Sequence, residues 1–136
     1  MKEILFRGKQ AINGDWVKGN LFIPCKPDTP TQILVGTNIY RVSYDVIPET
    51  VGQYTGLTDK NGKKIFEGDI LAFSDKLVYV NWHDYCGCWD FSYLKAINGK
   101  ATLCEDRSPK KWGYNAVVVG NIYDNPELLK EGGQRC

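Results

Sequence analysis

Short stretches in which apolar and polar residues alternate dominate this chain, and turn residues separate them. From residue 39 to 47, the sequence IYRVSYDVI places an apolar side chain at almost every second position. A period of two is typical of a strand with one buried face. Residues 116–123 form a nearly continuous apolar run instead, which predicts a central strand covered on both sides. No segment predicts an amphipathic helix of three turns, so the pattern indicates an all-β protein.

Turn chemistry supports this interpretation. Asn-Gly pairs occur at Asn13-Gly14, Asn61-Gly62 and Asn98-Gly99, and Asn-Gly between apolar stretches is a strong hairpin signal because both central residues of a type I′ turn need positive φ. Glu67-Gly68-Asp69 predicts a further tight turn. The segment PCKPDTP, residues 24–30, contains three prolines and predicts a loop, because proline cannot donate to a strand ladder.

The C-terminal part predicts one short helix. Asp124-Asn125 supply a capping side chain, Pro126 suits the first helical position and Glu127 suits the first turn. A glycine pair at 132–133 would end the helix, and residues 131–136 are expected to be a flexible tail. We therefore expect one domain over residues 1–130, built as a small barrel or two packed sheets with additional hairpins.

Charge and composition narrow the classes of partner. With 17 Lys and Arg against 16 Asp and Glu, the net charge is +1, which gives no overall field to attract nucleic acid or an anionic membrane. Apolar runs are far shorter than the ~20 residues that span a bilayer, and the charged first residues contain no signal-peptide core. We expect a soluble cytoplasmic protein whose five cysteines are free thiols.

The central stretch contains residue types that are common in phosphate and calcium sites. Gly56 and Gly62 are separated by five residues, and Lys64 occupies the position where a phosphate loop needs Ser or Thr. A calcium loop would need oxygen ligands beyond Asp59 and Asn61. Both templates fail on spacing, so we expect neither a nucleotide nor a cofactor.

Catalytic and metal sites are weighed as a third hypothesis. Glu67 and Asp69 would share a face only if Gly68 were extended, and the single histidine, His83, has no nucleophile at a recognisable spacing. Cys86-Gly87-Cys88, with His83 and Cys104, could form a metal or redox pair, but a zinc site normally shows two C-x2-C pairs. The simpler interpretation is small buried or edge thiols. We expect no metal and no enzymatic activity.

One loop suggests nucleic-acid binding. The segment RSPKKWGY interleaves basic and aromatic residues, which can neutralise phosphates and stack on bases, and Trp82, Tyr85 and Trp89 could extend such a platform. The alternative function is therefore binding of single-stranded nucleic acid. The residues that would carry it are Arg107, Lys110, Lys111 and Trp112.

Four blocks of the sequence resemble the YopX family of bacteriophage and prophage proteins. They are FRGK at 6–9, GDWVKGN at 14–20, ETVGQYTGLTDKNGKKIFEGDI at 49–70 and VVGNIYDNPELL at 118–129. The resemblance implies a compact β fold with an SH3-like barrel in a phage or prophage protein, and it implies no reaction. The shared positions, which could serve turns or line a surface, are Gly52, Tyr54, Gly56, Asp59, Gly62, Glu67, Gly68 and Asp69.

We therefore expect a non-catalytic protein-interaction or self-assembling module of the bacterial cytoplasm. Its protein partner is unknown, and exposed strand edges favour homo-oligomers. Nucleic-acid binding is the alternative, and a cryptic enzyme or metal protein using Glu67, Asp69, His83, Cys86 and Cys88 is the third hypothesis.

Overall fold

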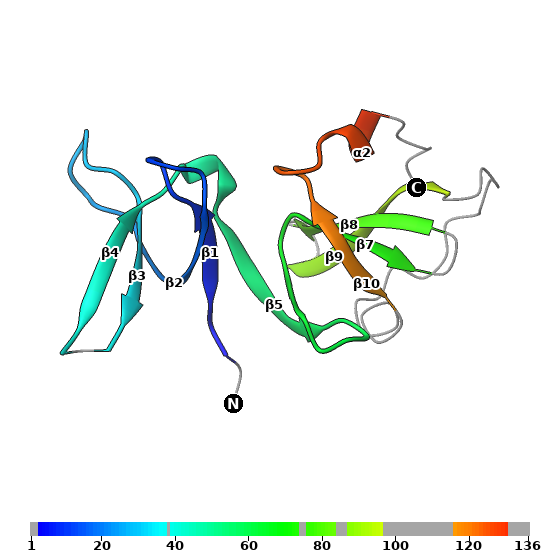
Figure 1. Cartoon of the computed structure of the whole chain (residues 1–136), viewed down its shortest axis with the longest axis horizontal. Coiled ribbons are helices and arrows are strands. Elements are labelled where there is room, and N and C mark those ends of the chain that lie inside the picture. The colour runs from blue at the N-terminus through cyan, green and yellow to red at the C-terminus, as the bar shows by residue number, and fades with distance from the viewer. Residues whose placement is uncertain (1–2, 38, 74–75, 84–86, 97–115, 131–136) are drawn as a thin grey trace. The chain divides into compact units, whose positions relative to one another are not determined.

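The computed structural model describes residues 3–37, 39–73, 76–83, 87–96 and 116–130 (Figure 1). Contacts divide the chain into two compact units, Met1–Tyr54 (unit 1) and Thr55–Cys136 (unit 2), and each is described by itself. The single domain expected over residues 1–130 stays a prediction. The expected tail, residues 131–136, lies outside the described residues.

The all-β class is confirmed. Among the described residues the strands pair into two antiparallel sheets. The first has the order β4 (Arg41–Asp45), β3 (Gln32–Gly36), β2 (Trp16–Phe22), β1 (Phe6–Lys9), β5 (Gly52–Thr58), β6 (Lys64–Phe66). The second has the order β10 (Val117–Asn121), β7 (Asp69–Phe73), β8 (Lys76–His83), β9 (Cys88–Ala96). In the described residues this pairing forms no closed barrel, so the SH3-like barrel stays a prediction. At the position of the expected helix lies one helical turn, α2 (Glu127–Lys130). No helix among the described residues is both long enough and apolar enough to cross a membrane.

Unit 1 is a sheet of short strands in which the first four follow one another in space as they do in sequence, whereas the fifth pairs with the first. Its elements are β1 (Phe6–Lys9), β2 (Trp16–Phe22), β3 (Gln32–Gly36), β4 (Arg41–Asp45), the 3-10 turn η1 (Pro48–Thr50) and the start of β5 (Gly52–Thr58). The turn predicted at Asn13-Gly14 joins β1 to β2, with φ of 75° at Gly14. Val17, Ile33 and Val46 form its core.

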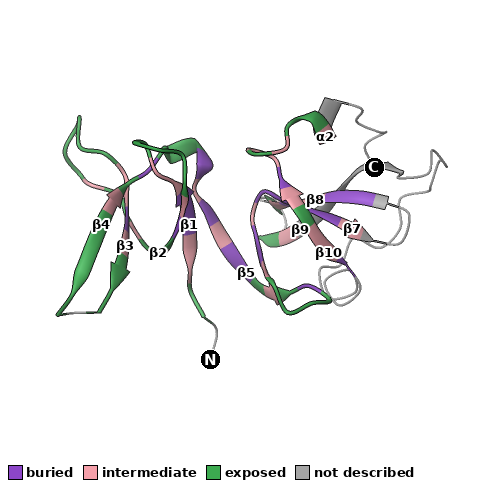
Figure 2. Cartoon of the chain, in the orientation of Figure 1, coloured by how far each residue is buried: buried purple, intermediate pink, exposed green. Residues whose placement is uncertain are grey.

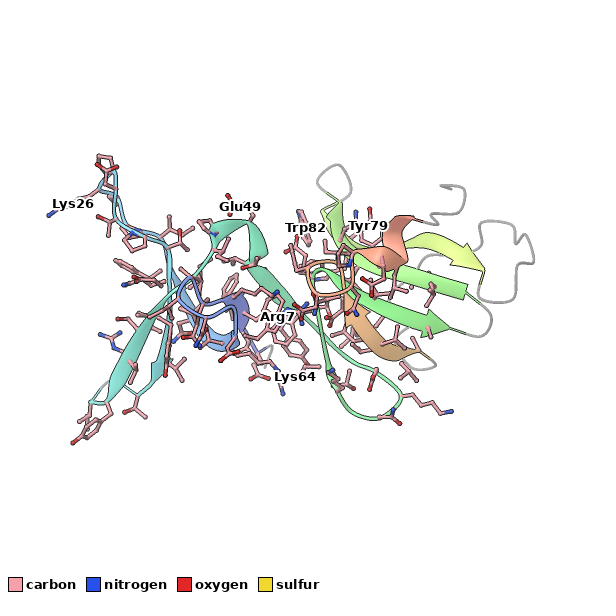
Figure 3. The ribbon with its side chains drawn as sticks, turned by 45° about the horizontal axis from the view of Figure 1, so that its top comes forward. Arg7, Lys26, Glu49, Lys64, Tyr79 and Trp82 are labelled. Atoms are coloured by element: carbon pink, nitrogen blue, oxygen red, sulfur yellow. The ribbon has the colours of Figure 1, made fainter. Side chains whose placement is uncertain are left out.

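The β1–β2 pair carries a concentration of basic and aromatic side chains. Arg7, labelled in Figure 3, is buried, and its guanidinium lies 4.6 Å from the centroid of the Trp16 ring. The Lys9 ammonium lies 5.6 Å from the same centroid. Cation–π contacts of this kind are attractive. The Trp16 ring can therefore stabilise the two positive charges of Arg7 and Lys9 beside it.

The β3–β4 hairpin follows the period-two pattern seen in the sequence. Ile33 pairs with Tyr44 on the core face, while Leu34 and Ser43 pair on the opposite face. The hairpin turns at Gly36, whose φ is +123° and where a Cβ would collide with the carbonyl oxygen of Tyr40. Only glycine fits there, because that backbone conformation is strained for any L side chain.

Unit 2 contains the remaining strands around its own core. They are β6 (Lys64–Phe66), β7 (Asp69–Phe73), β8 (Lys76–His83), β9 (Cys88–Ala96) and β10 (Val117–Asn121). The main buried cluster consists of Ile65, Leu71, Val78, Val80 and Ala116. Aliphatic side chains from three strands and the segment before β10 thus exclude water from one face of the β7–β8 pair.

The prediction of a central strand at residues 116–123 is wrong. In the described residues β10 pairs only with β7 and ends the strand order, and Val119 is 46% exposed. The second neighbour of β10 is a turn: the Lys60 N–H donates to the Ala116 carbonyl at 2.9 Å, and the Val118 N–H donates to the Asp59 carboxylate at 2.9 Å. An apolar run in the sequence does not show whether the second neighbour of the strand is a turn or another strand.

Candidate functional site

The shared residues of the central stretch, residues 49–70, are the first candidate site. Among them, the Asp59 carboxylate accepts three backbone N–H groups. Asp59 is 5% exposed and begins the turn between β5 and β6. Its Oδ1 accepts the backbone N–H groups of Asn61 at 2.8 Å and Lys63 at 2.9 Å. Its Oδ2 accepts the N–H of Val118, 59 residues away in the sequence. One carboxylate therefore shapes the turn and attaches it to β10.

These contacts keep Asp59 ionised. Burial raises the pKa of its carboxyl, but the hydrogen bonds from Val118, Lys63 and Asn61 and the positive charge of Lys63 lower it by more. The pKa therefore lies below its ordinary value of 3.8. A carboxylate stabilised in this way is a poor general base, and both of its oxygens are engaged by backbone donors.

Gly68 and Asp69 hold the other end of β10. The Gly68 N–H donates to the Val80 carbonyl at 2.8 Å, and its carbonyl accepts the Ile122 N–H at 2.9 Å. Asp69 is 1% exposed, its Oδ2 accepts the Phe66 N–H at 2.8 Å, and its Cα pairs with that of Asn121. The turn at Asp59 and the turn at Gly68 thus bind the two ends of β10.

The other shared positions also serve the backbone. Gly52 is buried and pairs with Arg7 in unit 1, where the Tyr54 N–H donates to the Leu5 carbonyl at 2.7 Å. Gly56 and Gly62 have φ of 89° and 83°, and Glu67 is half-buried in the turn before β7. Gly52 and Tyr54 therefore belong to unit 1, and the other six shared residues belong to unit 2. In the described contacts those six residues do not line one common cavity.

The remaining sequence candidates are only partly described. No group of three or more possible metal-ligating side chains occurs among the described residues. Cys88 is exposed and pairs through the backbone with His83, whereas Cys86 and Cys104 lie outside the described residues. So does the whole loop with Arg107, Lys110, Lys111 and Trp112, and nucleic-acid binding there stays a prediction.

Two of the three aromatic residues suggested to extend a base-stacking platform, Trp82 and Trp89, lie within the described residues. Trp82 of β8, labelled in Figure 3, pairs across the strands with Trp89 of β9. Their ring centroids are 5.0 Å apart and the ring planes cross at 76°. An edge-to-face pair of this kind stabilises a sheet, and Trp82 remains partly exposed. Tyr85 lies outside the described residues.

Sequence analysis missed a second candidate, the outer half of the β3–β4 hairpin. Figure 2 colours most of β4 and the end of β3 as exposed. Val35 and Val42, which pair across the hairpin, are 36% and 55% exposed, and Ile39 and Tyr40 at the turn are 88% and 83% exposed. The alternation did predict that Val42 would share a face with Tyr44, but it could not show that the core ends before reaching Val42.

The hydrogen bonds at either end of the hairpin identify which groups of β4 face outward. The Thr37 N–H donates to the Tyr40 carbonyl, and the Val46 N–H donates to the Thr31 carbonyl. In an antiparallel ladder, hydrogen-bonded pairs alternate with non-hydrogen-bonded pairs. Val42 and Tyr44 therefore bond to β3. The N–H and C=O groups of Arg41 and Ser43 point away from it.

This outward edge is open over a short length. Beyond β4 it is covered by the chain after β1, because the Ala11 N–H donates to the Asp45 carbonyl at 2.9 Å and the Ile47 N–H donates to the Lys9 carbonyl at 2.8 Å. At Arg41 and Ser43, β4 has no neighbouring strand other than β3 among the described residues. The edge carries neither a proline nor a bulge, two common devices that prevent strand addition.

Two hollows flank this edge. One, of about 360 Å³, is lined by Leu34, Ile39, Arg41 and Ser43. The other, of about 410 Å³, is lined by Gln10, Ala11, Ile12, Ser43, Tyr44 and Asp45. Ser43 borders both hollows.

Comparisons with known proteins agree on the fold and supply no activity. A protein-family model described as YopX protein matches residues 5–130. Among solved structures, the crystal structure of protein EF1440 from Enterococcus faecalis is similar with a TM-score of 0.53 at 22% identity, covering 95% of this chain and 99% of that one. No curated protein matches the chain. At this identity the likeness to EF1440 shows the fold alone.

We expect Asp59→Asn to lower the free energy of unfolding by about 1–3 kcal/mol at neutral pH, because the new amide would point a donor at the Val118 N–H or lose one of the turn bonds. The depressed pKa gives stability that is present above pH 3.8 and is lost as pH falls through the pKa of the folded state. The difference between wild type and variant should therefore shrink in acid. Urea unfolding at several pH values measures it.

Asp15→Asn, which removes an exposed carboxylate, is the control for net charge and should change stability little. A difference between wild type and Asp59→Asn that stays constant throughout the acid range would contradict this role of the ionised carboxylate.

We also expect Gly68→Ala to destabilise the fold more than Gly62→Ala. Both glycines have positive φ, which costs an alanine about 1–2 kcal/mol, but a Cβ at Gly62 meets nothing within 4 Å. At Gly68 it lies 3.0 Å from the Tyr123 ring, which adds about 1–3 kcal/mol of overpacking. Thermal and urea unfolding of the two variants test this, and equal losses would show that the contact with the Tyr123 ring contributes nothing.

Proposed function

The chain belongs to the YopX family, as its sequence predicted, and we propose that it is a non-catalytic module that binds protein. It acts through the open edge of β4 and the exposed apolar side chains of the β3–β4 hairpin. The partner contributes an extended segment that adds to β4 as a further strand, with an apolar side chain beside Val42.

One observation carries this proposal: Arg41 and Ser43 present two N–H and two C=O groups at an edge that has no second strand in the described residues. Backbone hydrogen bonds to an edge supply affinity in strand addition, and neighbouring side chains supply specificity. The exposed Val35–Val42 pair continues the core face of the sheet, so a partner could bury apolar area at the same place.

The absence of a catalytic role is part of the proposal and is supported by the bonding of the shared acidic residues. Asp59 and Asp69 accept backbone N–H groups at 2.8–2.9 Å, which is what a turn needs. A catalytic pair would instead need two carboxyls with different pKa values facing a common substrate cavity. Neither of the two hollows beside β4 contains either residue.

Source and location complete the proposal. The family resemblance points to a bacteriophage or prophage protein, and the small net charge of +1 favours a protein partner over a polyanion. We place its action in the cytoplasm of a bacterial host.

The test is site-specific photo-crosslinking in bacterial cells that express the full chain. A benzophenone amino acid at Val42 should give adducts whose other component is protein, because the β4 edge is occupied. The matched control places the same group at Val119, an exposed valine on β10 of unit 2.

The proposal requires protein adducts at position 42 in clear excess over position 119. Equal yields at both positions, or no protein adduct at position 42, would contradict it.

A further inference from the structure

The function proposed above does not specify the partner, and the backbone groups at the edge of β4 restrict what it can be. Resting on that proposed function, we propose that the added strand is β4 of a second copy of this chain. The two strands run antiparallel about a two-fold axis that passes between the two copies of Val42. The result is a symmetric dimer with one continuous sheet.

The register follows from which backbone groups are open. In a two-fold antiparallel pair, each outward-facing residue must meet an outward-facing residue of the other copy. Arg41 and Ser43 are the two residues of β4 whose outward N–H and C=O groups both lack a partner among the described residues. Arg41 of one copy therefore faces Ser43 of the other, and each of the two such pairs exchanges both of its N–H···O=C bonds.

The neighbouring registers are less suitable. An axis at Ser43 would need the outward carbonyl of Asp45, which already accepts the Ala11 N–H, and Ala11 would occupy the path of the second strand. An axis at Arg41 would set two guanidinium groups directly opposite each other, and like charges in that position are destabilising. It would also pair Ser43 with Ile39, which lies in the hairpin turn rather than in β4.

Side chains on the core-side face match in the chosen register. The two copies of Val42 lie opposite each other in a non-hydrogen-bonded pair, in which side chains come closest. With Val35 at each side, four valines that are exposed in the single chain form one row across the joined sheet. Tyr40, 83% exposed, lies opposite the half-buried Tyr44 of the second copy.

Charges on the opposite face are complementary. Arg41 lies diagonal to Asp45 of the second copy, a separation of about 7–8 Å that a long side chain can reach across. The Asp45 carboxylate is already oriented, because its Oδ1 accepts the Gln32 side-chain N–H at 2.8 Å. The same contact occurs twice by symmetry, and the pairing uses the open edge in both copies, so association ends at two chains.

The test compares two cysteine variants of the full chain under mild oxidation. In the proposed register, the Cα atoms at position 42 lie about 4.5 Å apart, within the range of about 4.4–6.8 Å for a disulfide. Val42→Cys should therefore crosslink to itself. Ser43→Cys should not, because its two copies are diagonal neighbours about 7–8 Å apart. Mass spectrometry identifies peptides joined through the new residue, which separates them from links between the five native cysteines.

Efficient self-crosslinking of the Val42→Cys variant, with little self-crosslinking of the Ser43→Cys variant, is the expected result. The opposite preference would place the axis at Ser43 and overturn the inference. So would the absence of a crosslink at both positions.

Sedimentation velocity supplies a second measurement that does not depend on cysteine chemistry. Val42→Lys places two like charges face to face and should remain a monomer at concentrations where wild type and Val119→Lys form dimers. A monomeric wild type at every concentration overturns the dimer, yet protein adducts at position 42 in cells would then still support strand addition by another partner. A lack of those adducts, in contrast, contradicts the proposed function itself.

Discussion

The arrangement of unit 2 depends on the hydrogen bonds that the buried Asp59 carboxylate accepts. A buried carboxylate is tolerated only where donors compensate for its lost hydration, and here three backbone N–H groups do so. Two of them close the turn between β5 and β6, and the third comes from β10. Gly68 and Asp69 repeat this role at the other end of β10. The strand ends its sheet, yet both of its ends are attached to one short stretch of chain.

That dependence explains residue types that suggested other chemistry. Glycine, lysine and aspartate between residues 56 and 69 resemble parts of phosphate and calcium loops, but Gly56, Gly62 and Gly68 supply positive φ and Asp59 and Asp69 accept N–H groups. A residue whose bonding capacity is used inside the fold has little left for a ligand. At the β4 edge, in contrast, hydrogen-bond donors and acceptors are exposed beside apolar side chains and are available to a ligand.

Local pattern predicted much of the fold. The alternation at residues 39–47 identified β4 and its two faces, and the Asn-Gly pairs at 13–14 and 61–62 marked hairpin turns, because both signals depend on neighbouring residues alone. In these two turns only the glycine has the positive φ expected of both residues. The third pair, Asn98-Gly99, lies outside the described residues. The neighbours of a strand depend on contacts distant in sequence, so the run at 116–123 was mistaken for a central strand. For the same reason the sequence located the shared residues of the candidate site but not the open edge. That edge depends on a contact distant in sequence, because Ala11 covers Asp45 and leaves Ser43 exposed.

Residue-resolved amide hydrogen exchange, measured from dilute to concentrated protein, tests whether the β4 edge is open in the single chain and pairs with a second copy. We expect the amides of Val42 and Tyr44, which bond to β3, to be protected at every concentration. Those of Arg41 and Ser43 should exchange rapidly in dilute solution and become protected as concentration rises. Protection of Arg41 and Ser43 in the dilute chain, or rapid exchange at all concentrations, would contradict an open edge that pairs with a second copy.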